Sequence, residues 1–177
     1  MKVLHLQPSS RRPPGRPGVV GKLLVAVLLN ASLPLAAGDE PVPVTPACLT
    51  RGEGETTREA VLKIQPPEVE LLARLTYAEA SSTGFQDDPR VYAGIAWGVM
   101  NRVRLSAVSA TARRDYGSGV AGVIFKPQQF NPAVSLKSPF SRDFLCPRDA
   151  GRWTLAQEAA VSVFTVSLSH PEMWGDP

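Results

Sequence analysis

The clearest pattern of hydrophobic and polar positions is helical and lies in the middle of the chain. Leu71, Leu72 and Leu75 share one face of a helix with 3.6 residues per turn. Pro66-Pro67 and the acidic residues that follow are typical of a helix start. We predict a helix from about 66 to about 80, ended by the polar stretch 81–84.

The rest of the chain predicts further helices separated by long loops. Asp88-Pro89 indicates an N-cap and the first position of a second, largely apolar helix, VYAGIAWGVMNRVRL. The polar stretch 106–118 predicts a loop, and 119–125 predicts either one or two helical turns or a short strand. The proline-rich stretch 126–149 should be irregular, and a last helix should occupy about 153–169. Since no segment is rich in strand residues, the predicted class is a small, mostly α domain with long loops.

The first 65 residues read as two segments outside this domain. A basic head precedes the apolar run 23–37, which ends in small residues before Asp39-Glu40. This layout predicts a secretory signal peptide, residues 1–37, cleaved near Ala36 or Ala37; the alternative is an uncleaved N-terminal anchor. Residues 38–65 are proline-rich and then glycine-broken, so we expect a lead or linker, with ordered structure from Pro66.

Export alters how charge and cysteines are interpreted. The whole chain has a formal net charge of +3, but beyond residue 37 fourteen Lys and Arg face sixteen Asp and Glu, which gives −2. This removes the main support for nucleic-acid binding, and any membrane contact would come only through the signal segment. Cys48 and Cys146 could form one disulfide in an oxidising compartment or remain two free thiols. With only His5 and His170, neither a catalytic triad nor a zinc site is expected.

Glu79 is the residue that does not fit the helical pattern. It lies four residues after Leu75 and seven after Leu72, so it points to the same side as the leucines. A carboxylate there is costly unless it is paired or reaches a cleft, and a partly dry site raises its pKa toward that of a general acid. The alternative is an ordinary solvated or salt-bridged glutamate at a helix end. Periodicity by itself leaves both open.

Three segments, in order, resemble the SleB-type cell wall hydrolases, the catalytic domain of spore cortex-lytic enzymes. Residues 77–80 (YAEA) end the first apolar helix, residues 100–103 (MNRV) match a family L-N-R-V, and residues 123–130 match V-I-x-x-P-x-Q-F. The resemblance spans roughly residue 66 to the end. It implies a lysozyme-like, lytic-transglycosylase-like helical fold that cleaves peptidoglycan glycan strands between N-acetylmuramic acid and N-acetylglucosamine, without a metal or cofactor, in the periplasm or cell wall.

The resemblance also implies roles for individual residues. Glu79 matches the single catalytic acid. Gln129 and Phe130 would border the glycan groove, or else serve as a loop amide and a core ring, and Tyr77 would line the cleft or face solvent. The Asn101-Arg102 pair is expected to hold loops rather than to touch substrate.

The chain departs from the family pattern after HPEMWGDP, where relatives continue into a T-x-G-A-x-x-Y/F segment. The domain, 66–177, is therefore expected to be truncated or different at this end. This keeps a second hypothesis open, a non-catalytic or inactive peptidoglycan-binding envelope protein. A third, a generic helical interaction module, leaves the three ordered motifs unexplained.

Overall fold

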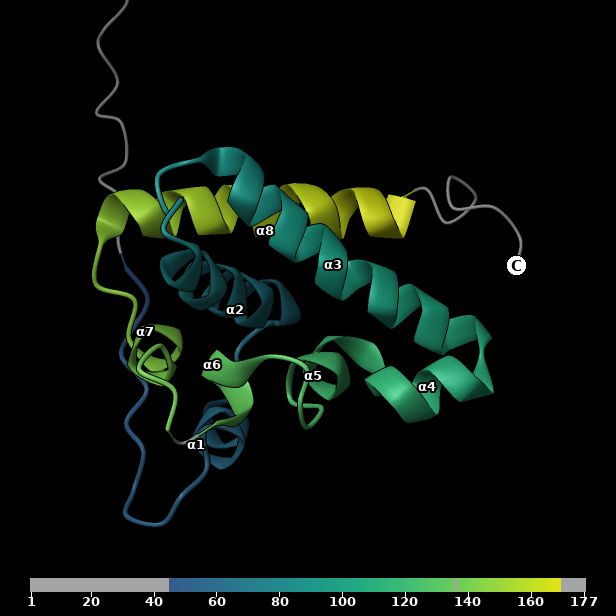
Figure 1. Ribbon diagram of the computed structural model, residues 1–177, viewed down its shortest axis with the longest axis horizontal. Helices are drawn as coiled ribbons and strands as arrows, with labels where there is room; N and C mark the ends of the chain where they lie inside the picture. Colours follow the sequence, from purple (N-terminus) through teal and green to yellow (C-terminus); the bar gives the residue numbers. More distant parts are fainter. Residues whose placement is uncertain (1–44, 136, 170–177) are drawn as a thin grey trace, which may run out of the picture. The chain divides into compact units, whose positions relative to one another are not determined.

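Helices make up 69% of the residues that the computed structural model describes, which are 45–135 and 137–169, and none of these residues forms a strand. The prediction of a mostly α fold is confirmed at this level. The expected signal peptide, the lead up to residue 44 and the HPEMWGDP segment lie outside the described residues. The helices (Figure 1) are α1 Thr57–Ile64, α2 Glu68–Thr83, α3 Pro89–Val108, α4 Ala110–Tyr116, α5 Gly119–Ile124, α6 Asn131–Val134, α7 Ser141–Leu145 and α8 Ala150–Ser169.

The core forms where α2, α3 and α8 pack against one another (Figure 1). Small buried side chains on α8, Ala156 and Ala160, let that helix lie close to its neighbours. The rings of Tyr77 on α2 and Trp153 on α8 are buried with their centroids 6.4 Å apart. Every side chain of α2 from residue 71 to residue 78 is buried, and α2 is the central element of the fold. No helix of the described part carries an apolar stretch long enough to cross a bilayer.

The predicted start of the second helix is confirmed. Asp88 is the N-cap of α3, and its carboxylate accepts a hydrogen bond from the backbone N–H of Arg90 at 2.9 Å. Pro89 occupies the first helical position, where its missing N–H costs nothing. The N-cap residue and the proline were sufficient to predict where α3 starts, because both act within one turn of the helix.

Ordered structure does not begin at Pro66, as expected, but earlier. Thr56 and Glu59 form a capping box at the start of α1: the Thr56 hydroxyl accepts from the Glu59 N–H, and the Glu59 carboxylate accepts from the Thr56 N–H. Ala60 and Val61 are buried, and α1 contacts α6. The glycine-broken composition of this segment hid a helix whose cap and buried face fix it to the domain.

The predicted loop 106–118 is also wrong, because most of it is α4. The Ser109 hydroxyl caps this helix by accepting from the Ala112 N–H at 3.2 Å. Arg113 then reaches back to the end of α3 and donates to the carbonyls of Ser106 and Ala107 at 3.0 and 3.1 Å. Tertiary contacts with α3 thus support a helix that polar composition alone did not indicate. The stretch 119–125 is helical rather than extended, as α5, and 126–149 contains the short α6 and α7.

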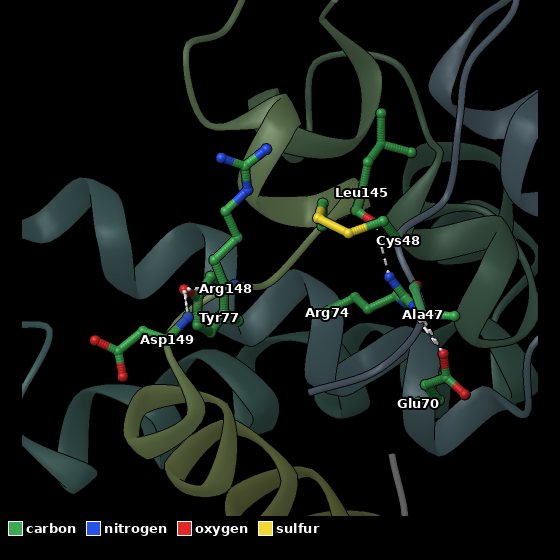
Figure 2. Close-up of a disulfide and its surroundings, with 9 residues drawn as sticks. Ala47, Cys48, Glu70, Arg74, Tyr77, Leu145, Arg148 and Asp149 are labelled. Carbon is green, nitrogen blue, oxygen red and sulfur yellow. Dashed lines mark hydrogen bonds and ion pairs between the residues drawn. A yellow bond between two sulfur atoms is a disulfide. The ribbon is translucent and has the colours of Figure 1, made fainter. Parts of the chain in front are cut away.

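A buried arginine and a disulfide join the beginning of the described chain to α2 and to the end of α7 (Figure 2). Arg74 on α2 is 1% exposed. Its guanidinium donates to the carbonyl oxygens of Ala47 at 2.8 Å and Leu145 at 2.9 Å, and pairs with Glu70 at 2.8 Å. The Cys48–Cys146 disulfide, which the sequence allowed, lies beside these contacts.

Replacing Arg74 should strongly destabilise the protein. Arg74→Ala leaves two carbonyls without their donor and Glu70 without its partner, so we expect a loss of about 3–5 kcal/mol in the free energy of unfolding. Urea denaturation followed by circular dichroism measures it. The matched control is Arg90→Ala, which removes an exposed pair with Asp88 and should change the free energy of unfolding little. Equal losses in both variants would contradict a structural role for Arg74.

Removing the disulfide should also lower stability. It closes a loop with a sequence separation of 98 residues, so it restricts the unfolded chain considerably. The double variant Cys48→Ser/Cys146→Ser should lose about 2–5 kcal/mol in the free energy of unfolding. Wild type in dithiothreitol should match the double variant, whereas the double variant should not respond to dithiothreitol. A wild type insensitive to full reduction would refute the prediction.

Candidate active site

Near its C-terminal end the buried helix α2 reaches a cavity through Glu79. Between residues 71 and 80 every residue is buried except Glu79, which is half-buried. Ala78 and Ala80 on either side are completely enclosed, so the backbone that carries Glu79 is held on both sides by the core. The carboxylate is thus attached to a rigid element and still accessible, as a reacting group requires.

Hydroxyl groups extend α2 past the point where we predicted its end. Ser81, Ser82 and Thr83 donate to carbonyl oxygens of the last turn, those of Tyr77, Glu79 and Ala80 respectively, at 2.7–2.9 Å. Only the Ala80 carbonyl is among the last four of the helix, which have no intrahelical partner, and the Tyr77 and Glu79 carbonyls gain a second donor. Gly84 then ends the helix with a φ of 78°, a conformation that glycine adopts readily. Glu79 therefore lies inside the last full turn rather than in a frayed terminus.

The cavity at Glu79 has a volume of about 440 Å³, and most of the residues that line it have polar side chains. One wall is the end of α2. The other is formed by the segments around α6 and before α7, which contribute amide, hydroxyl and ammonium groups. Its lining residues are Glu79, Ser82, Gln128, Gln129, Asn131, Pro132, Ser135, Lys137, Ser138, Pro139 and Phe140.

Burial raises the pKa of the Glu79 carboxyl above its ordinary value. No hydrogen bond or ion pair joins this carboxylate to another residue of the described part, so desolvation acts without compensation. The nearby acids serve elsewhere: Asp88 caps α3, and Asp87 pairs with Arg152 at 3.2 Å. Among the described residues that line the cavity Glu79 is the only carboxylate, and its raised pKa favours proton donation.

The structure brings only one of the three predicted substrate-binding residues to this cavity. Gln129 lines it. Tyr77 is 5% exposed, and its hydroxyl accepts from the backbone N–H groups of Arg148 and Asp149 at 3.3 and 3.1 Å (Figure 2). It neither lines the cavity nor faces solvent, because it fixes the start of α8. The role predicted for Tyr77 in substrate binding is therefore replaced by a structural one.

Phe130 takes the alternative that the sequence left open, a core position. It is 9% exposed, and the Arg102 guanidinium lies 5.4 Å from its ring centroid and 5.8 Å from that of Tyr116. Arg102 also donates to the Gly98 carbonyl at 2.7 Å. This hydrogen bond stays within α3, so Arg102 meets its neighbours through the two rings, and Phe130 anchors the segment that carries Gln129.

Sequence reasoning missed most of the polar wall. Gln128 lines the cavity and has a φ of 68°, a left-handed conformation that costs a non-glycine residue about 1–2 kcal/mol. Asn131, Lys137 and Ser138 also line it. Gln128 and Asn131 lie close to Gln129 in KPQQFNP, which was the available signal, but nothing in the pattern indicated which side chains line the cavity. No group of three or more His, Cys, Asp or Glu in the described part is arranged to hold a metal ion.

Glu79 should make stability depend on pH in a defined direction. Its pKa is higher in the folded protein, so between the unfolded and folded pKa values the folded state binds more protons and stability falls as pH rises. Glu79→Gln cannot lose a proton. Its free energy of unfolding relative to wild type should therefore increase from about pH 3 to about pH 8. Urea denaturation at each pH measures the difference, and Glu158→Gln on α8 controls for the substitution itself. A gain that does not grow with pH would refute the prediction.

The comparisons with known proteins leave the cavity without a described counterpart. No protein-family model, no curated protein and no solved structure matches the chain. What the chain does must therefore be inferred from the cavity at Glu79 and from the three ordered motifs.

Proposed function

We propose that the chain is an exported enzyme that cleaves the glycan strand of peptidoglycan between N-acetylmuramic acid and N-acetylglucosamine, with Glu79 as its single catalytic carboxylate. The observation that carries the proposal is a lone, half-buried carboxyl with a raised pKa in a polar cavity, on the residue that matches the catalytic acid in the resemblance to SleB-type hydrolases. The same resemblance supports a lysozyme-like arrangement of the helices and a place in the periplasm or cell wall.

One carboxylate is sufficient if the substrate supplies the nucleophile. The protonated Glu79 gives its proton to the glycosidic oxygen, and the bond from this oxygen to C1 of the muramoyl sugar breaks. Glu79, now a carboxylate, takes the proton of the 6-hydroxyl of the same sugar as that oxygen bonds to C1. The products are a free 4-hydroxyl and a 1,6-anhydro end, and Glu79 is protonated again. Glycosidases that use two carboxylates place the second one in the same cleft. The described residues that line this cavity include no carboxylate besides Glu79.

The polar wall suits an amino sugar. The amides of Gln128, Gln129 and Asn131 and the hydroxyl of Ser138 can bond both hydroxyl and acetamido groups, and the ring of Phe140 offers an apolar surface to a sugar face. Because none of these groups bonds to Glu79, they can orient a sugar without changing the charge state of the acid.

Replacing Glu79 should abolish cleavage. The full chain should release soluble muropeptides from purified sacculi, and Glu79→Gln, which keeps the shape but cannot donate the proton, should lower the rate by about 10²–10⁴-fold. Mass spectrometry of the products distinguishes the anhydro end of a lytic transglycosylase from the reducing end of a muramidase, in which water replaces the 6-hydroxyl.

The matched control is Glu158→Gln, an exposed glutamate on α8 that should keep the wild-type rate. If Glu79→Gln is as active as wild type, the assignment of the acid is wrong. If wild type binds sacculi without releasing a product, the chain is the non-catalytic peptidoglycan-binding protein instead. If it does neither, both hypotheses fail.

A further inference from the structure

A second hollow is lined by residues of α1 and α6, two helices that Figure 1 shows next to each other. Its volume is about 760 Å³, larger than that of the cavity at Glu79. Arg58 and Leu62 of α1 form one side, and Phe125 and Val134 are on the opposite side. The early helix α1, which the sequence did not predict, therefore creates a wall that the predicted domain would have lacked.

The two hollows adjoin each other. Gln128, Asn131 and Ser135 line both of them, so these three residues lie at the boundary between the two hollows. Gln128 holds its left-handed backbone conformation at this boundary. A ligand whose reacting bond lies at Glu79 can therefore extend along α6 into the second hollow.

The chemistry of the second hollow differs from that of the Glu79 cavity. Leu62, Phe125 and Val134 give it apolar surface, whereas the first cavity is lined mainly by amides and hydroxyls. Arg58 is exposed and has no hydrogen bond or ion pair with any residue of the described part. The neighbouring Glu59 also lines the hollow, and its Oε2 is held by the capping box. An unpaired guanidinium beside an aliphatic surface fits a short chain that alternates small apolar groups with carboxylates.

We propose that the second hollow binds the stem peptide of the glycan strand that is cleaved at Glu79. This inference rests on the proposed function. The stem peptide is attached through the lactyl group of the muramoyl sugar, which is the sugar whose bond to C1 breaks, so the peptide begins within one ring of Glu79. It is short, starts with a small aliphatic residue and carries free carboxylates, which Arg58 would bind.

The decisive experiment compares two soluble substrates, glycan strands that carry stem peptides and the same strands stripped by an amidase. The full chain should have a higher kcat/KM on the peptide-bearing strands. Arg58→Glu should lower kcat/KM on these strands about tenfold, through KM, and leave the stripped strands unaffected. Since Arg58 lies in the first turn of α1, a glutamate there is compatible with the helix dipole, so the variant is expected to fold.

Two further variants separate charge from shape. Arg114→Glu makes the same charge reversal on α4, outside both hollows, and should behave as wild type on both substrates. Leu62→Ser removes apolar surface from an already 44% exposed side chain and should weaken only the peptide-bearing substrate. Equal kcat/KM values of wild type on both substrates, together with no effect of Arg58→Glu, would overturn the inference while the proposed function stands.

A binding measurement keeps the inference testable if no strand is cleaved. A free stem tripeptide titrated into the full chain carrying Glu79→Gln should bind, and Arg58→Glu should weaken that binding about tenfold whereas Arg114→Glu should not. Binding that depends on Arg58 in the absence of cleavage would retain the peptide site and reject only the proposed catalysis. Absence of binding, or binding indifferent to Arg58, would reject the peptide site.

Discussion

The buried guanidinium of Arg74 is the constraint on which the rest of the structure depends. A charged group in a core is stable only if its donors are used, and Arg74 directs them to Glu70 and to the carbonyls of Ala47 and Leu145. It thereby fixes two segments far apart in sequence against the middle of α2, and the Cys48–Cys146 disulfide joins the same two segments covalently. The polar network specifies which segments meet, and the disulfide limits how far they separate when the chain unfolds.

This arrangement determines what kind of site α2 can carry. The helix is enclosed on all sides from residue 71 to 78, so it has little freedom to shift when a ligand enters the cavity at its end. Glu79 follows directly on this rigid part, and the hydroxyls of Ser81, Ser82 and Thr83 extend the helix beyond it. The acid is consequently held by the core, whereas the residues that would contact a ligand belong to shorter elements. Under the proposed function, the reacting group and the ligand-binding residues therefore lie on different parts of the fold.

Much of the fold could be predicted from the sequence wherever a signal acts within one or two turns. The N-cap and proline at Asp88-Pro89, the leucine spacing of α2 and the position of α8 are of this kind. The helices α1 and α4 were missed because their polar composition is outweighed by contacts with α6 and α3, which are not visible in a local pattern. The same limit explains Tyr77: a helical wheel with one apolar face cannot show that the opposite face is also covered, here by the start of α8. Glu79 drew attention because it breaks the helical pattern, although only the resemblance gave it a role, whereas Gln128 and Lys137 break no pattern.

The pKa of Glu79 does not depend on the residues that would contact a ligand. In many sites the pKa of an acid is set by a neighbouring charge, so that a substitution in the binding wall also changes the proton affinity. Here burial alone raises the pKa, and no described residue bonds to the carboxylate. The amides of Gln128 and Gln129 can therefore change position to suit a ligand without themselves changing the pKa of Glu79. A ligand that fills the cavity displaces water from the carboxyl and disfavours its charged form further, so binding itself favours the protonated state that donation requires. A lone carboxyl on a rigid helix is sufficient, because this rise in its pKa depends only on the exclusion of water from the cavity.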